Sequence, residues 1–409
     1  MKKKENFWTM ILVLTVLIGL VITTGGCPPK PDGGEGEGEG EIQIPNLMGQ
    51  LQTDAQAAIV AAGLAVGTID NICSDIIAAG RVISTNPVVE TSVSPGISVD
   101  LIVSTGPCSG EGEIKIDTIE ELQLIGSDPA YPIDGNYVLT QDIDASATAN
   151  WNNGAGFKPI GKFSGVFNGQ DYIITNLTIN RPDENYVGLF SYVSTSDKVM
   201  NIGLNGGAIM GHDRVGGLIG INSGQLTNCY VTGTVTGYGY EVGGLIGINS
   251  FGQLTNCYVT GAVIGYSGYV GGLVGSNYDG GVVTNCYATG AVTGSGGVGG
   301  LVGGNYGGVV TNCYATGAVI SEGGGSVGGL VGYNDEYSGG KVRASFWDMQ
   351  TSGQLTSAGG GIYSFTADMT LQATFAIMGW DFNSVWTIEE GCTYPYLQTL
   401  ISPFTGCVL

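Results

Sequence analysis

The 409-residue chain has a single histidine, His212, and few charged side chains: Asp, Glu, Lys and Arg together make up 12% of it. One histidine excludes zinc sites of the H-E-x-x-H type and argues against a Ser-His-Asp triad. Basic residues are scarce, with 13 Lys and Arg against 35 Asp and Glu, so the formal net charge is −22. This acidity disfavours nucleic acid as a partner.

Glycine is abundant, with 73 residues, and much of it belongs to a repeat. The phrase Val215-Gly-Gly-Leu-Ile-Gly returns four times with small variations, at intervals of 27, 28, 28 and 29 residues. The later copies start at Val242, Val270, Val298 and Val327. A second phrase, Leu226-Thr-Asn-Cys-Tyr-Val-Thr-Gly, returns in versions that start at Leu254, Val283 and Val310. A fixed period of this length predicts stacked structural units.

The short apolar runs of each repeat, separated by glycines, predict strands and turns. A single unit of about 28 residues cannot bury a core, but stacked units can, because each strand pairs in parallel with its copy in the next unit. We therefore expect a mainly β fold, a right-handed parallel β-helix with one coil per repeat. Gly-Leu-Ile-Gly, Leu-Thr-Asn-Cys-Tyr and Gly-Thr-Val are its three expected strands, with glycines at the corners.

Stacking places equivalent residues of successive coils above one another. One expected column is Asn222, Asn249, Asn277, Asn305 and Asn334, and a second is Asn228, Asn256, Asn285 and Asn312. An aromatic column contains Tyr230, Tyr258, Tyr287 and Tyr314, and a thiol column contains Cys229, Cys257, Cys286 and Cys313. Stacked amides hydrogen-bond along such an axis, so we favour ladder stabilisation over a binding face. The cysteines match no metal pattern and are expected to be small buried side chains without disulfides. No metal or cofactor is predicted.

These phrases resemble the GLUG repeats of bacterial surface proteins. Upstream phrases, including Phe163-Ser-Gly-Val-Phe-Asn-Gly and Val187-Gly-Leu-Phe, extend the resemblance to about residues 114–400. The resemblance implies a parallel β-helix. It leaves function open, since such repeats occur in adhesins, in IgA-protease-type peptidases and in lipoproteins.

The N-terminus has the pattern of a signal peptide over residues 1–26: three lysines, then an apolar stretch from Trp8 to Ile22. Thr23-Thr-Gly-Gly-Cys27 resembles a bacterial lipobox, which implies lipid attachment at Cys27. Ordinary cleavage near Gly26 and an uncleaved anchor are the alternatives. By resemblance to Gram-negative lipoproteins, Pro28 favours the outer membrane. Acyl chains on Cys27 would hold the protein to a bilayer.

A small separate domain is expected at residues 44–107. Thr53-Asp-Ala-Gln56 predicts a helix start and Gly63 its end, before three strands at Leu64–Ile69, Arg81–Ser84 and Ser98–Ser104. The order and phrases of this segment, among them Ile44-Pro-Asn-Leu-Met-Gly, resemble a PASTA domain. The resemblance implies either peptidoglycan binding or a spacer.

Both ends of the β-helix are expected to carry caps. Thr118-Ile-Glu-Glu121 predicts a capping-box helix at the start. At the other end a helix is expected over Thr366–Thr374, followed by an aromatic cluster that packs as a cap or, as the less favoured alternative, binds sugar. The cluster comprises Trp380, Phe382, Trp386, Tyr394 and Tyr396. Export to an oxidising compartment makes Cys73 with Cys108, and Cys392 with Cys407, candidate disulfides.

The chain thus divides into a signal peptide (1–26), a Pro/Gly/Glu-rich linker (27–43), the small domain (44–107), a second linker (108–113), the β-helix (114–345) and a C-terminal cap (346–409). The favoured function is a non-enzymatic cell-envelope lipoprotein that displays a binding or adhesion rod, with peptidoglycan or a surface glycan as ligand. One alternative is a structural or self-associating envelope component. A third is a carbohydrate-active enzyme, with Asp142 and Asp144 on one strand face as candidate carboxylates.

Overall fold

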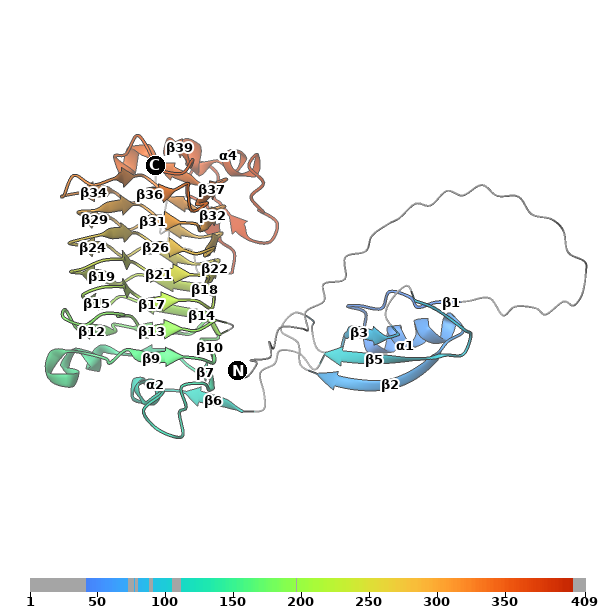
Figure 1. The fold of residues 1–409 in the computed structure, drawn as a ribbon. Coiled ribbons are helices and arrows are strands. Elements are labelled where there is room, and N and C mark those ends of the chain that lie inside the picture. The colour runs from blue at the N-terminus through green and yellow to red at the C-terminus, as the bar shows by residue number, and fades with distance from the viewer. Residues whose placement is uncertain are drawn as a thin grey trace, which may run out of the picture. The chain divides into compact units, whose positions relative to one another are not determined.

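The computed structural model describes residues 42–72, 77, 80–87, 91–104, 112–195 and 197–399. The chain forms two compact units, Met1–Cys108 and Ser109–Leu409, each with its own hydrophobic core (Figure 1). No helix in this described part is long and apolar enough to span a membrane.

The first unit is a small α+β domain. Helix α1 (Gln52–Ala61) accompanies a sheet of order β2-β5-β3, formed by Ala65–Ile72, Ser98–Ser104 and Val82–Asn86. Strand β2 is parallel to β5, and β3 is antiparallel to it. A short antiparallel pair, β1 (Ile42–Gln43) and β4 (Ser92–Val93), completes the unit. Helix–sheet packing buries Ile59, Leu64, Val82 and Leu101.

The predicted start of α1 is wrong by about two residues. Leu51, not Thr53, is the N-cap, and no side chain caps this end. The first turn is held by tertiary contacts instead: the Gln52 amide donates to the Gly80 carbonyl at 2.8 Å, and Leu51 forms a β-bridge with Arg81. The predicted end is close to Gly63, which has a φ of 77°.

The second unit is a parallel β-solenoid, which confirms the predicted mainly β fold. Four sheets run along the stack, and the repeats visit them in the order sheet 3, sheet 4, sheet 1, sheet 2. Sheet 1 contains β6 (Glu113–Ile116), β7 (Asn136–Leu139), β8 (Ile143–Asp144), β10 (Val166–Asn168), β11 (Ile173–Thr175), β14 (Lys198–Asn205), β18 (Gln225–Val231), β22 (Gln253–Thr255), β23 (Tyr258–Val259), β27 (Val282–Thr284), β28 (Tyr287–Ala288), β32 (Val309–Thr311), β33 (Tyr314–Ala315), β37 (Lys341–Arg343), β38 (Phe346–Asp348) and β39 (Ile362–Ser364).

The other three sheets are shorter. Sheet 2 contains β12 (Thr178–Asn180), β15 (Ala208–Gly211), β19 (Thr234–Gly237), β24 (Val263–Gly265), β29 (Val292–Gly294) and β34 (Val319–Ser321). Sheet 3 contains β16 (Val215–Gly216), β20 (Val242–Gly243), β25 (Tyr269–Gly271), β30 (Gly297–Gly299) and β35 (Val327–Gly328). Sheet 4 contains β9 (Ile160–Phe163), β13 (Phe190–Val193), β17 (Ile219–Asn222), β21 (Ile246–Ser250), β26 (Val274–Tyr278), β31 (Val302–Tyr306) and β36 (Val331–Asp335).

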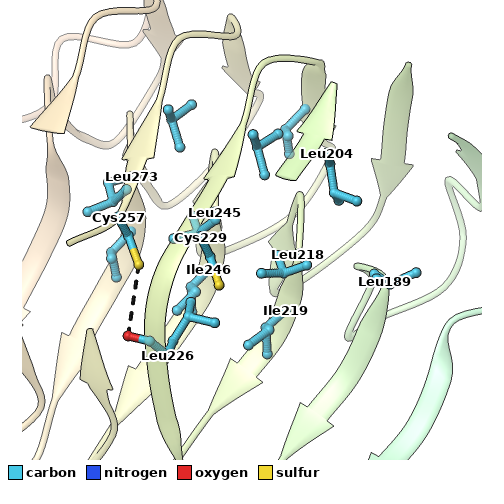
Figure 2. Close-up of a cluster of buried hydrophobic side chains, with 14 of the residues drawn as sticks. Leu189, Leu204, Leu218, Ile219, Leu226, Cys229, Leu245, Ile246, Cys257 and Leu273 are labelled. Atoms are coloured by element: carbon cyan, nitrogen blue, oxygen red, sulfur yellow. Dashed lines mark hydrogen bonds between the residues drawn. The ribbon is translucent and has the colours of Figure 1, made fainter. Parts of the chain in front are cut away.

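Sheet 3 was not predicted, because three strands per coil were expected. The Val-Gly pair at each corner is itself paired in register, Val215 with Val242 and Val242 with Val270. The core is filled by stacked apolar side chains of successive coils. Figure 2 shows Leu218, Leu245 and Leu273 in successive coils, near Cys229 and Cys257.

The ends of the solenoid are capped. Helix α2 (Ile119–Leu124) lies at the end where β6 begins (Figure 1) and has the predicted capping box between Thr118 and Glu121. At the other end, β38 and β39 still continue sheet 1 beyond residue 345, where the cap was expected to begin. Trp347 of β38 enters the core and is 3% exposed.

The remaining elements are short. They are the 3₁₀ segments η1 (Ser146–Gly154) and η2 (Asp368–Thr370), the helices α3 (Met349–Ser352) and α4 (Gln372–Ala376), and the antiparallel pair β40 (Trp386–Thr387) and β41 (Tyr396–Leu397). The single helix expected over Thr366–Thr374 is therefore wrong. It is split into η2 and α4, because Leu371 between them has extended backbone angles.

Candidate binding face of the solenoid

The first asparagine column is a continuous buried ladder. The side-chain amide of Asn222 donates to Asn249 at 2.9 Å, Asn249 to Asn277 at 2.9 Å, and Asn277 to Asn305 at 3.0 Å. Asn305 donates to Asn334 at 2.7 Å. Each amide nitrogen also donates to a glycine carbonyl in its own coil. The glycine is required, since a Cβ at Gly308, for example, would collide with the Asn277 amide. The side-chain amides make their hydrogen bonds within the stack, so this column stabilises the fold.

The second asparagine column bends sheet 1. Asn228, Asn256, Asn285 and Asn312 all have φ between 53° and 55°, the left-handed conformation that asparagine tolerates best among residues with a side chain. Their amides form a second ladder that runs the opposite way: Asn256 donates to Asn228 at 3.2 Å, and Asn228 donates to Asn201 at 2.9 Å. This column, too, makes its hydrogen bonds inside the stack.

The cysteines of the repeats are completely buried and free. The Cys229 thiol donates to the Thr227 carbonyl at 3.1 Å, and Cys286 makes the same contact with Thr284. Burial raises the pKa of the Cys286 thiol well above its ordinary value. Cys392 is disulfide-bonded. The candidate partner Cys407, the candidate pair Cys73 and Cys108, and the lipidation candidate Cys27 lie outside the described residues.

Three of the four tyrosines in the sheet 1 column are buried under the C-terminal segment, while Tyr230 is only partly buried. Tyr258, Tyr287 and Tyr314 stack with ring centroids 4.8 and 5.0 Å apart and are at most 3% exposed. Trp386 packs 6.1 Å from both Tyr287 and Tyr314, and the Tyr314 hydroxyl donates to the Pro395 carbonyl at 2.7 Å. The aromatic cluster of the C-terminus therefore packs as a cap over this column, and these rings are not available for a ligand.

The candidate catalytic carboxylates act as backbone caps. Asp142 accepts a hydrogen bond from the Ile173 amide at 2.9 Å, and Asp144 accepts from the Ser146 amide at 3.0 Å. The hydrogen bonds from Ser146 lower the pKa of Asp144. His212 is half-exposed, with its Nδ1 3.3 Å from an Asp213 oxygen. Within the described residues, no three His, Cys, Asp or Glu side chains gather closely enough to hold a metal ion.

The coils differ most in chemistry at the corner that precedes each Val-Gly pair. The residues there, taken coil by coil, are Tyr186, Arg214, Glu241, Tyr269, Gly297 and Ser326. Arg214 lies over the Tyr186 ring, 5.1 Å from its centroid, and donates to its hydroxyl at 3.0 Å. The Arg214 Nε is 3.6 Å from the Glu241 Oε2, which is buried and accepts no hydrogen bond within the described part of the chain. Burial raises the pKa of Glu241, and Arg214 opposes this rise.

A tyrosine patch extends from this corner onto sheet 4. We define it as Tyr240, Tyr269, Tyr278, Tyr306 and Tyr333. Tyr278 stacks on Tyr306 with centroids 4.8 Å apart, Tyr306 lies 5.3 Å from Tyr333, and the hydroxyls of Tyr306 and Tyr269 are hydrogen-bonded. Tyr240 and Tyr333 are 58% and 37% exposed. Gathered exposed aromatic surface of this kind is typical of interaction sites.

A hollow of about 220 Å³ lies within this patch. It is lined by Tyr240, Tyr269 and Tyr333, by Ser326, and by the glycines Gly268, Gly296 and Gly297. The five tyrosines do not form one recurring column, so the repeat pattern alone does not predict this patch. A sequence feature that could have indicated the patch is a tyrosine at a position where the equivalent residues of other coils are not aromatic.

A larger hollow of about 330 Å³ lies near α2, lined by Gln123, Ser127, Trp151, Asn152 and Lys158. Its amides are already engaged. Gln123 donates to the Lys158 carbonyl at 2.9 Å and accepts from the Lys158 amide at 2.7 Å, and Asn152 donates to the Gly156 carbonyl at 2.7 Å. These groups fix the N-terminal cap, so the tyrosine patch is the stronger candidate site.

Comparison with known families identifies two segments of the chain. The PASTA domain model matches residues 42–105, and the GLUG motif model matches residues 211–236, 238–264, 266–293 and 294–320. The chain contains a PASTA domain and four GLUG motifs. The tyrosine patch begins in the second GLUG motif and ends just beyond the fourth.

Several known proteins are each similar to part of this chain. Halomucin of Haloquadratum walsbyi is 39% identical over 154 residues, which is 36% of this chain and 2% of Halomucin. A candidate Gly-rich membrane protein of Evansella cellulosilytica is 39% identical over 103 residues, 24% of this chain and 12% of that protein. The chain thus spans only a small part of the length of either relative.

The solenoid also resembles a solved structure. The crystal structure of a candidate immunoglobulin A1 protease from Bacteroides ovatus superimposes with a TM-score of 0.54, covering 71% of this chain and 94% of that one. The two are 21% identical, so the likeness supports the fold alone.

Proposed function

We propose that this protein is a cell-envelope binding protein. Its PASTA domain contacts peptidoglycan, and its GLUG solenoid presents a binding face to a glycan at the cell surface. The PASTA match supports the first part, since such domains bind peptidoglycan-like ligands in general. The similarity to a Gly-rich membrane protein supports placement in the envelope. Lipid attachment at Cys27, with an outer-membrane location, remains part of this proposal.

The observation that carries the proposal is the tyrosine patch. The two asparagine columns hydrogen-bond within themselves, and the buried rings of the sheet 1 tyrosine column lie under the C-terminal segment. A second exposed aromatic pair, Tyr238 and Tyr266, stacks with ring centroids 5.2 Å apart, but neither ring lines the hollow. At the patch, exposed rings project from a rigid parallel stack. A rigid element is a good support for a binding site, because its side chains are held in place before the ligand arrives.

A non-enzymatic role is part of the same proposal. The carboxylates that would have served a carbohydrate-active enzyme, Asp142 and Asp144, hold backbone amides instead. Glu241, which follows Tyr240 in the sequence, is paired with Arg214. Asp142 accepts from an amide of the following coil, and Asp144 accepts from an amide two residues further along its own coil.

The first experiment measures whether the small unit by itself binds peptidoglycan. Because it has its own core, residues 42–108 are produced alone and sedimented with purified peptidoglycan sacculi. Enrichment in the pellet over an equal amount of an unrelated small protein is the expected result. Failure to sediment would overturn the peptidoglycan contact and leave the domain as a spacer.

A second experiment tests the anchor. The full chain and its Cys27→Ser variant are expressed in a Gram-negative host and partitioned between detergent and aqueous phases. The wild type is expected in the detergent phase, and the variant should lose the mass of the acyl chains. Equal partitioning and equal mass would argue against lipidation.

A further inference from the structure

We propose that the hollow bordered by Tyr240, Tyr269 and Tyr333 binds a sugar ring that carries an acetamido group. This inference rests on the proposed function, because it names the ligand class and the subsite of the solenoid's binding face. The hollow measures about 220 Å³, which is smaller than the roughly 300–1,000 Å³ of a pocket for a whole drug-sized ligand. It therefore suits one ring of a longer saccharide, with the neighbouring rings over the rest of the tyrosine patch.

The walls of the hollow are suited to a pyranose. Tyrosine combines a large apolar ring face with a hydroxyl that donates and accepts hydrogen bonds. A sugar ring has the complementary character, with C–H groups on its faces and hydroxyls around its edge. Tyr240 and Tyr333 are exposed enough to meet a ligand, and the hydrogen bond between Tyr269 and Tyr306 holds the third wall in position.

Two of the glycines that line the hollow, Gly268 and Gly296, lack the side-chain acceptor that equivalent positions in earlier coils have. In the preceding coils, a side chain of one coil accepts a hydrogen bond from the backbone amide of the next. Asn185 accepts from the Asp213 amide at 3.1 Å, and Asp213 accepts from the Tyr240 amide at 2.7 Å. The next two residues of this column are Gly268 and Gly296.

Neither of these glycines finds the acceptor that the earlier coils supply. By the pattern of the earlier coils, the acceptor for the Gly268 amide would be the side chain of Tyr240, and the acceptor for the Gly296 amide would be a side chain at Gly268, which has none. Among the residues that the structure describes, none accepts a hydrogen bond from either amide. Two backbone donors on residues that line the hollow, one coil or about 4.8 Å apart, thus have no partner among the described residues and are left for a ligand or water.

The acceptors used in the earlier coils indicate the chemistry of the missing group. One is the amide oxygen of Asn185 and the other is a carboxylate oxygen of Asp213. A carboxylate ligand is disfavoured, because the chain has a net charge of −22. The neutral choice is an amide oxygen, and an acetamido group presents that oxygen on a sugar ring.

A cationic ligand is the main competitor, because aromatic rings and an acidic protein both attract cations. The unpaired amides of Gly268 and Gly296 argue against a cation. Unpaired N–H groups present the positive end of their dipoles, which repels a cation and attracts an oxygen lone pair. Arg214, three coils before the Gly296 position, is paired with Glu241, so this pair adds no net charge at the corner.

The test uses the solenoid unit, residues 109–409, which has its own core and lacks the PASTA domain. Chitohexaose is titrated by calorimetry against the wild type and a Tyr240→Ala, Tyr333→Ala double variant. Tyr337→Ala is the matched control, because Tyr337 is fully exposed and lies outside the patch. Cellohexaose, with a hydroxyl in place of each acetamido group, and choline are the comparison ligands.

We expect the wild type to bind chitohexaose at least tenfold more tightly than cellohexaose. The double variant should lose at least tenfold in affinity, and Tyr337→Ala should stay within twofold. Equal binding of the two saccharides would overturn the acetamido assignment, and an unchanged affinity of the double variant would overturn the site. Binding of choline without chitohexaose would show a cation site instead. None of these outcomes depends on the PASTA domain, so sedimentation of residues 42–108 with sacculi remains a separate test of the proposed function.

Discussion

Asn277 occupies the middle of the buried asparagine ladder, and its removal tests how much the ladder stabilises the solenoid. Asn277 is completely buried and takes part in three hydrogen bonds: it accepts from Asn249 at 2.9 Å and donates to Asn305 at 3.0 Å and to the Gly281 carbonyl at 3.1 Å. Each buried hydrogen bond contributes a net 0.5–1.5 kcal/mol, so Asn277→Ala should lower the free energy of unfolding by about 2–4 kcal/mol.

A position at the end of the same ladder provides the control. Asn334 is half-buried and takes part in two of these hydrogen bonds, one from Asn305 and one to the Gly340 carbonyl. Water can replace a lost partner there, so Asn334→Ala should cost only about 1 kcal/mol. Asn277→Asp is a second probe: it keeps the acceptor, loses both donors and buries a carboxylate, and should cost at least as much as Asn277→Ala.

The assay is urea unfolding of residues 109–409, followed by circular dichroism and by tryptophan fluorescence. Coincident transitions and an unchanged dependence on urea are needed before midpoints are converted to free energies. Equal losses for the Asn277 and Asn334 alanine variants, or a loss below about 1 kcal/mol at Asn277, would refute the ladder as a main source of stability.

Three further predictions concern the caps and the buried thiols. Tyr314→Phe removes the donor to the Pro395 carbonyl, so the C-terminal segment should be cut faster in limited proteolysis, with a stability loss of about 1 kcal/mol; an unchanged cleavage rate would contradict this docking. Burial raises the pKa of the Cys286 thiol in the folded protein above that of the unfolded chain. The neutral thiol therefore contributes fully to the free energy of unfolding below about pH 8.5, and this contribution is lost as the pH rises further, because the unfolded chain releases the proton first. The urea midpoint should fall between pH 7.5 and pH 9.5 (roughly one unit either side of that value) and fall less in Cys286→Ala, whereas identical slopes would exclude the thiol as the cause. Thr118→Ala breaks the capping box with Glu121 and should cost about 1 kcal/mol in the same unfolding assay; no loss would mean that the cap is held by its buried face alone.

The repeat made the solenoid predictable. A period of 27 to 29 residues forces equivalent residues into register, so parallel pairing of Asn222 with Asn249, or of Tyr230 with Tyr258, follows from the spacing alone. The capping box of α2 was equally predictable from the sequence, because the Thr118 and Glu121 side chains each accept a hydrogen bond from the other residue's backbone amide within four residues. By contrast, the start of α1 depends on Gly80, about thirty residues away in sequence, and no local signal could show it.

The binding face was not predictable in the same way. The recurring aromatic residues, such as Tyr287 and Tyr314, can be identified in the sequence as a column, yet the C-terminal segment folds back over them. Tyr240 and Tyr333 belong to different columns and are distant in the chain. Only the closing of successive coils brings them to one hollow.

The sequence by itself determined the stack, its register, its ladders and the separate PASTA domain, because each of these depends on spacing or on local hydrogen bonds. The tertiary structure decided which columns are covered and which are exposed, since coverage depends on where the non-repeating ends of the chain fold. It also decided where a backbone donor lacks its partner. At Gly268 and Gly296 the missing acceptor belongs to the neighbouring coil, and only the stacked coils show which neighbour that is.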